Sequence, residues 1–186
     1  MRARLTAAAI AALIDKGYAG TTALEVCGRA GVTRGAFHHH FVSLAALYVA
    51  ALEQLYRDFT QAPPAAAARG AESRPLRALV RRFAEATRRP QFKAVIEIWL
   101  AARNDAAVRA EVAPAIAQLS QMFSPTDSRV AKHIGSSRKA AAFYRLLMEA
   151  TIGMALGRAV SPSNRPLAHE EMVLDLLAEL ADDIAR

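Results

Sequence analysis

Residues 17–41 read GYAGTTALEVCGRAGVTRGAFHHHF, and this stretch decides the fold. Gly17 is placed to end a preceding helix in the left-handed backbone region. Thr22 and Glu25 stand at the spacing of a capping box, in which the threonine hydroxyl accepts from the Glu25 amide and the Glu25 side chain reaches back to the Thr22 amide. The helix that begins there is short, because Gly31 breaks it.

A second short helix follows at once. Thr33 is a favourable N-cap, and Val32 can pack on Phe37 as a hydrophobic staple. Pairs of helices joined in this way are typical of a helix-turn-helix, which commonly places its second helix in the DNA major groove. The stretch therefore predicts a DNA-reading module.

The segments on either side also have helical patterns. Residues 2–16 place apolar side chains on one face, and residues 44–59 repeat the i, i+3, i+4, i+7 spacing over four turns. So long an apolar stripe must be buried, so we expect the second of these helices to link the module to the rest of the chain. Prolines and a glycine predict a loop and a domain boundary over residues 61–75.

Five further helices are expected. Three lie between residues 73 and 123, and Pro114 is expected to kink or split the last of them. Two long helices, about 138–160 and 167–184, close the chain after a loop at 124–137 in which one helical turn fits. The expected fold class is all-α: an N-terminal three-helix DNA-binding module joined to a C-terminal helical domain.

The amino-acid composition agrees with an all-α fold and limits the classes of function that the protein can have. The chain of 186 residues is 53% hydrophobic and rich in alanine and leucine, which favours helices. A net charge of +7 suits an anionic partner such as nucleic acid, although many basic proteins bind none. The chain contains no nucleophile elbow, Walker loop, dinucleotide-binding glycine pattern or zinc-ligand spacing, so we expect no enzyme and no cofactor.

The cellular compartment is expected to be the cytoplasm. The single cysteine, Cys27, excludes an internal disulfide and fits a reducing environment. A small buried thiol is the expected role for Cys27, and a redox switch is the alternative. No signal peptide is visible, and the apolar run at residues 146–160 is too short to span a bilayer, so no membrane association is expected.

Residues 17–47 resemble the TetR family of bacterial transcriptional repressors. The pattern GYxxTT…AGVTxGxFxxHF carries the resemblance, and the apolar face of residues 2–16 fits the family's first helix. The matching residues are Gly17, Tyr18, Thr21, Thr22, Val26, Ala30, Gly31, Val32, Thr33, Gly35, Phe37, His40, Phe41 and Leu47.

The resemblance implies a homodimeric, ligand-responsive repressor that binds a palindromic operator in double-stranded DNA. It implies a DNA-binding domain at residues 1–47 and a ligand-binding and dimerisation domain at residues 48–186. Arg34 can pair with guanine, and Gly35 lets the helix approach DNA closely. For Thr22 and Thr33, helix capping alone is the alternative to a DNA contact. The expected DNA-binding residues are Arg2, Thr22, Thr33, Arg34, Gly35, His38 and His39.

The chain departs from the family pattern at two positions. The usual tyrosine is His38 and the usual lysine after the loop is Leu44, and both usual residues commonly hold phosphates in the family. His38 can still donate to a phosphate and Leu44 cannot, so weaker DNA binding is expected, with basic residues such as Arg29 as candidates to compensate. The three consecutive histidines do not predict a metal site, because successive helical residues point about 100° apart.

The remaining expectations concern the effector and the dimer. A small apolar or aromatic effector is expected among the helices between residues 76 and 151, and Trp99 is the best single candidate because a buried indole N–H needs a partner. Each candidate has plain core packing as the alternative. The candidate effector residues are Phe83, Thr87, Trp99, Met122, Phe123, Phe143, Tyr144 and Met148.

Small residues at Gly153 and Gly157 permit close helix contact, across the dimer or within the chain. The dimer interface is expected at Gly153, Gly157, Leu176 and Leu180. A second hypothesis is a dimer with the same fold that has lost useful DNA binding and acts through a protein partner or by sequestering a ligand. Leu44 and His38 are the residues that favour it.

Overall fold

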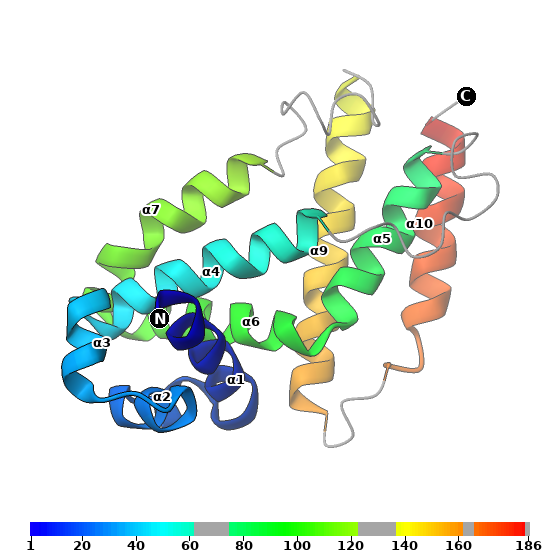
Figure 1. Cartoon of the computed structure of the whole chain (residues 1–186). Coiled ribbons are helices and arrows are strands. Elements are labelled where there is room, and N and C mark those ends of the chain that lie inside the picture. Colours follow the sequence, from blue (N-terminus) through cyan, green and yellow to red (C-terminus); the bar gives the residue numbers. More distant parts are fainter. Residues whose placement is uncertain (62–74, 123–136, 162–165, 185–186) are drawn as a thin grey trace. The chain divides into compact units, whose positions relative to one another are not determined.

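Nine α-helices make up the regular structure within the part of the chain that the computed structural model describes, which is residues 1–61, 75–122, 137–161 and 166–184. The expected all-α fold is confirmed (Figure 1). The helices are α1 (Arg2–Gly20), α2 (Ala23–Ala30), α3 (Arg34–His40), α4 (Leu44–Gln61), α5 (Pro75–Arg88), α6 (Pro90–Asn104), α7 (Ala106–Met122), α9 (Arg138–Val160) and α10 (Glu170–Ile184).

Contacts within the chain divide it into two compact units. The first comprises residues 1–61 and 90–120, and the second comprises residues 62–89 and 121–186. Helices α4, α6 and α7 therefore belong to the same compact unit as the first three helices. The boundary at residue 47 between the DNA-binding domain and the ligand-binding domain is not tested by this division into compact units, and it stays a prediction.

The first unit is built around the apolar face of α1. Leu5 and Ala9 of α1 are fully buried, together with Val26 of α2, Phe37 of α3 and Leu47 of α4. Each large side chain of this kind stabilises the fold by about 1.5–3 kcal/mol when it leaves water. This shared core orients α2 and α3 relative to each other, and so determines which side chains of α3 face outward.

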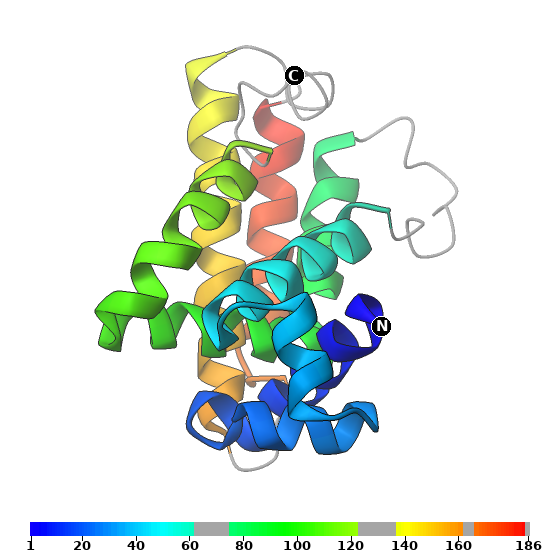
Figure 2. The ribbon, with the colours of Figure 1, turned by 60° about the vertical axis from the view of Figure 1, so that its left-hand side comes forward.

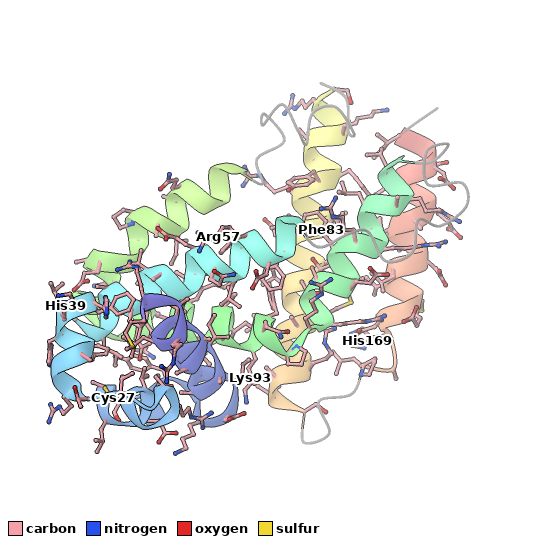
Figure 3. The ribbon with its side chains drawn as sticks, in the orientation of Figure 1. Cys27, His39, Arg57, Phe83, Lys93 and His169 are labelled. Atoms are coloured by element: carbon pink, nitrogen blue, oxygen red, sulfur yellow. The ribbon has the colours of Figure 1, made fainter. Side chains whose placement is uncertain are left out.

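Helix α1 is broken at Gly17, as the sequence predicts, and one more turn follows the break. Gly17 has φ 68° and ψ −175°, a backbone region open essentially to glycine alone. Helix α6 satisfies both sides of the break: Lys93 donates to the carbonyl of Ile14 (2.7 Å), and the amide of Tyr18 donates to Glu97 (2.7 Å). Lys93 lies beside α1 in Figure 3.

Helix α7 passes through Pro114 without being split, so of the two expected outcomes the split is wrong and the kink stays a prediction. Proline removes the hydrogen bond to the carbonyl of Ala110, one turn earlier. Both Ala110 and Pro114 are exposed, so water can satisfy that carbonyl and the helix can continue. The start of α7 is capped by Asp105, which accepts from the amides of Ala107 and Val108.

The second unit is a bundle of α5, α9 and α10, which run side by side in both views (Figures 1 and 2). Its core contains Leu76 and Val80 of α5, Leu147 of α9, and Leu174 and Leu177 of α10. Contact between these apolar stripes buries one face of each helix.

A buried ion pair lies among the three helices of the bundle. Arg158 Nη1 is 2.7 Å from Glu170 Oε1, and Arg158 Nη2 donates to the carbonyl of Thr87 in the last turn of α5 (2.8 Å). Glu170 also pairs with Arg88 (3.2 Å) and accepts from the amide of Leu167 (2.9 Å). The last contact explains why α10 begins at Glu170 rather than at residue 167: the preceding turn is held by this carboxylate.

The expected loops at 61–75 and 124–137, with the helical turn that fits in the second, lie almost entirely outside the described residues. Among the residues that are described, no single helix has the length and apolar character needed to cross a membrane. The pair Arg34–His40 and Leu44–Phe59, bent by 65°, meets those criteria only when both helices are taken together.

Candidate nucleic-acid interface

The helix-turn-helix caps form as the sequence predicts. The Glu25 amide donates to Thr22 Oγ1 (3.2 Å), and the Ala36 amide donates to Thr33 Oγ1 (3.2 Å). Gly31 ends α2 in the left-handed region, with φ 61° and ψ 46°. Because both caps use the side-chain hydroxyl, the two threonines set where α2 and α3 begin.

The prediction that the Glu25 side chain reaches back to the Thr22 amide is wrong. The Glu25 carboxylate pairs with Lys16 (2.8 Å) and with Arg29 Nε (2.7 Å) rather than reaching back to Thr22. These bonds, with Lys16 the larger contribution, lower the pKa of Glu25. Arg29 is also 2.6 Å from Asp15, so it is held by two carboxylates and is not the free cation that the sequence proposed as compensation.

The start of α3 is exposed and presents three consecutive candidates, Thr33, Arg34 and Gly35. Arg34 makes no hydrogen bond or ion pair with the described residues, so its five donors remain available. A Cβ at Gly35 would approach only Thr33 Oγ1, at 3.8 Å, so the protein's own packing does not require glycine there. The space beside Gly35 lies on the outer surface of α3, where a partner can approach closely.

Arg2 contacts the other end of α3. Its Nη1 donates to the carbonyl of His40 (3.2 Å), and its guanidinium lies 4.4 Å from the centre of the Phe41 ring. Partial burial, followed by His39, the N-terminus and Arg2, lowers the pKa of His40. Arg2 therefore has a structural role, although it remains exposed.

His38 and His39 are exposed on α3, and Figure 3 labels His39 on that helix. The His38 ring meets Phe37 edge to face, with 5.2 Å between ring centres. Cys27 is buried, with its sulfur 3.8 Å from the Thr33 carbonyl oxygen, which agrees with the expected buried thiol.

The start of α4 contains contacts that the sequence reasoning missed. Ser43 accepts from the Ala46 amide (2.9 Å) and so caps α4, and its hydroxyl donates to Glu111 of α7. Leu44 packs against the core of the module. A serine directly before an apolar helix is a recognisable capping signal, whereas nothing local in the sequence pairs Ser43 with Glu111, 68 positions later.

The candidate effector residues divide between the two units. In the first, Trp99 meets Phe92 edge to face (6.2 Å between ring centres), and Phe92 lies 5.9 Å from Phe59 of α4. The indole Nε1 of Trp99 is buried and has no hydrogen-bond partner among the described residues. Burial raises the pKa of Tyr56, also on α4, to about 12.

In the second unit the candidates lie in or against the core. Phe143, Tyr144 and Thr87 are buried, Phe83 and Met148 pack against the same core, and Phe83 meets Tyr144 edge to face at 5.6 Å. None of them lines the hollow of about 320 Å³ between α5 and α10. The side chain of Met122 and all of Phe123 lie outside the described residues.

The candidate dimer residues also separate into two groups. Leu176 is 66% exposed and Leu180 is 38% exposed, and a side chain added at Gly153 would meet open space. At Gly157 an added Cβ would lie 2.6 Å from Leu167 of the same chain. Packing within the chain therefore accounts for Gly157.

Comparisons with known proteins place the N-terminal module in a family. Residues 5–51 match the model of the bacterial regulatory proteins of the tetR family. The regulator CymR of Pseudomonas putida is 47% identical over 58 residues, which cover 31% of this chain and 29% of CymR. The matched segment is thus less than a third of that relative.

Solved structures match over almost the whole chain. A transcriptional regulator from Rhodococcus sp. Rha1 is 23% identical with a TM-score of 0.70, covering 98% of this chain and 95% of its own. The multidrug binding protein EbrR, complexed with imidazole, is 25% identical with a TM-score of 0.64, covering 96% and 93%. Residues 5–51 are therefore similar to the helix-turn-helix module of the bacterial regulatory proteins of the tetR family, and the fold of the chain is similar to that of the solved regulators.

Proposed function

We propose that the protein is a homodimeric transcriptional repressor that binds a palindromic operator and leaves it when a small molecule binds. The observation that carries the proposal is the exposed start of α3, where Thr33, Arg34 and Gly35 stand on a capped helix with an intact core beneath it. A helix presented in this way suits the DNA major groove.

The side chains of the module divide by role. Arg34 is placed to read a base edge, most favourably a guanine through two hydrogen bonds. Thr22, Thr33 and His38 contact backbone phosphates, which fix the register on DNA. Arg2 adds positive charge near the end of α3, where His39 is an exposed hydrogen-bonding side chain.

The second unit supplies the dimer interface in this proposal. Helix α9 leaves Leu146, Leu156 and Val160 exposed around Gly153, and α10 leaves Met172, Leu176 and Leu180 exposed. Two exposed apolar stripes on neighbouring helices favour burial against a second copy, since a contiguous apolar surface marks an interaction site. Two copies would place two α3 helices on successive turns of DNA.

Trp99 supports the effector part of the proposal. Its buried indole N–H lacks a partner among the described residues, and an unsatisfied buried donor costs about 1–3 kcal/mol. An aromatic effector with a hydrogen-bond acceptor would satisfy this N–H and stack on the rings of Phe59 and Phe92. EbrR has been solved with malachite green, an observation that concerns EbrR itself.

Helix α6 connects this position to the DNA-reading module. Trp99 lies two residues after Glu97, which holds the Tyr18 amide, and Lys93 holds the carbonyl of Ile14. An effector that favours a shifted α6 would therefore move α1, by its differential affinity for the two states.

A gel-shift assay tests the proposal. DNA flanking the gene is incubated with the full-length protein and with Arg34→Ala at 50 mM and 200 mM salt. We expect a specific complex with the wild type, and a loss of about 1–3 kcal/mol in Arg34→Ala. Arg145→Ala is the matched control, because Arg145 is an exposed arginine of α9. If the wild type forms no specific complex at the lower salt concentration, the proposed repressor function is refuted.

The alternative is a dimer of the same fold that sequesters a ligand or binds a protein partner. The contacts that favour it are at the DNA-facing edge: Leu44 packs inward, Arg29 is held by two carboxylates, and Glu111 lies against Ser43. A dimer in solution without a specific DNA complex would support this alternative, and a monomer would count against both functions.

A further inference from the structure

The carboxylate of Glu111 lies at the N-terminal end of α4. The Ser43 hydroxyl is 3.0 Å from Glu111 Oε1 and 2.9 Å from Oε2, while it accepts the capping bond from Ala46. Glu111 is exposed, and no cation of the described residues lies within ion-pair distance of it. No basic side chain among the described residues therefore neutralises the negative charge of Glu111.

The N-terminus of α4 is a natural position for an anion. The first amides of a helix point outward and carry about half a positive charge, which suits a phosphate or a carboxylate. Ser43 follows His40, the last residue of α3, by three residues, so the two Cα atoms are at most about 11 Å apart. Ser43, and Glu111 with it, therefore lies close to the C-terminal end of α3, the helix proposed above to enter the major groove.

We propose that Glu111 is an internal brake on DNA binding: its carboxylate occupies the end of α4 that would otherwise receive a DNA phosphate. The proposal rests on the DNA interface proposed above. Binding of a phosphate there requires Ser43 to exchange Glu111 for the phosphate, or brings two negative charges close together. Glu111 belongs to α7, outside the DNA-reading module. A shift of α7 that moves Glu111 away from Ser43 would therefore raise the affinity of the module for DNA, and a shift toward Ser43 would lower it.

The test uses DNA of random sequence, because phosphate contacts do not depend on sequence. Fluorescence anisotropy with a duplex of about 20 base pairs compares full-length wild type, Glu111→Gln and Glu149→Gln at 50 mM and 200 mM salt. Glutamine retains an oxygen for Ser43 and removes the charge. Glu149, exposed on α9, controls for the change in net charge.

We expect Glu111→Gln to bind about threefold to tenfold more tightly at 50 mM salt, with a smaller advantage at 200 mM because salt screens exposed charges. Glu149→Gln should stay within about twofold of wild type, and the Tm of Glu111→Gln should shift by no more than about 4 °C. Glu111→Ala, which removes the side-chain oxygen as well, should show the same gain in affinity.

Equal affinities of Glu111→Gln and Glu149→Gln would overturn the brake. A gain in affinity that persists unchanged at 200 mM salt would overturn its electrostatic basis. These outcomes are distinct from failure of the repressor function, which would appear as a wild type that binds random and gene-flanking DNA equally. Even if the repressor function fails in this way, the difference in affinity between Glu111→Gln and Glu149→Gln still tests whether Glu111 weakens DNA binding.

Discussion

Replacing Gly17 by alanine should destabilise the protein strongly, because two separate costs meet at this residue. Gly17 has φ 68° and ψ −175°, and holding a residue with a side chain in such a conformation costs about 1–3 kcal/mol. The new Cβ would also lie 2.9 Å from Glu97 Oε2, the oxygen that accepts from the Tyr18 amide at 2.7 Å. Displacing that carboxylate forfeits a charged hydrogen bond of about 1.5–3 kcal/mol.

The combined loss of about 2.5–6 kcal/mol is a large share of the 5–15 kcal/mol typical of a folded protein. Urea denaturation at one fixed protein concentration measures it, since the stability of the proposed dimer would depend on concentration. Gly28→Ala is the matched control: Gly28 is inside α2, and an added Cβ meets nothing within 4 Å. That substitution should stabilise by about 0.5–1 kcal/mol.

A double-mutant cycle separates the two costs. In a Glu97→Ala background, Gly17→Ala should retain only the backbone cost of about 1–3 kcal/mol, because the carboxylate is already gone. A loss below 1 kcal/mol in the wild-type background would refute the reasoning as a whole. An equal loss in both backgrounds would refute the part assigned to Glu97.

Three further outcomes follow from the structure. Thr33→Ala should cost about 1 kcal/mol of stability through the lost cap, and Thr33→Ser should restore most of it in the same urea assay. Leu176→Glu should shift the protein from dimer to monomer in sedimentation velocity, while Glu179→Gln, an exposed neighbour, should remain dimeric. Glu170→Gln should lower stability at pH 7 by about 2 kcal/mol or more, because it leaves buried Arg158 without its ionic partner.

The pH dependence of the Glu170 contribution has a defined sign. Burial alone would raise the pKa of Glu170, but hydrogen bonds from the Leu167 amide and from Arg158 outweigh burial and lower it. The contribution is therefore fully present above the ordinary pKa of a glutamate and is lost as the pH falls through the lowered value. Acid titration of urea stability should show this loss in the wild type and a smaller one in Glu170→Gln; identical acid limbs would contradict the assignment.

The local rules of helix formation predicted the helix-turn-helix closely. Thr22 and Thr33 cap α2 and α3, Gly31 ends α2, and the break at Gly17 falls at the expected residue. These features depend on contacts within four residues, so the sequence contains all the information needed. The stripe of α4 and the start of α9 were predictable for the same reason.

Predictions failed where a side chain has several possible partners, or where the outcome depends on access to water. Glu25 has several available donors and binds Lys16 and Arg29 instead of its own capping amide. The split that Pro114 could have caused does not occur, because the exposure of Ala110 lets α7 continue. The sequence pattern shows the competing charges of Glu25 but not which of them it binds, and it does not show whether a helical carbonyl is exposed to water.

The sequence by itself determined that the chain is helical and that residues 17–41 form a DNA-reading module, because capping and apolar periodicity act over a few residues. Only the tertiary structure decided how its charges are used. It pairs Arg29 with carboxylates, buries Arg158 against Glu170, leaves Arg34 exposed and brings Glu111 to the start of α4. Charge interactions depend on distance and on access to water, and both are set by packing between segments far apart in the chain.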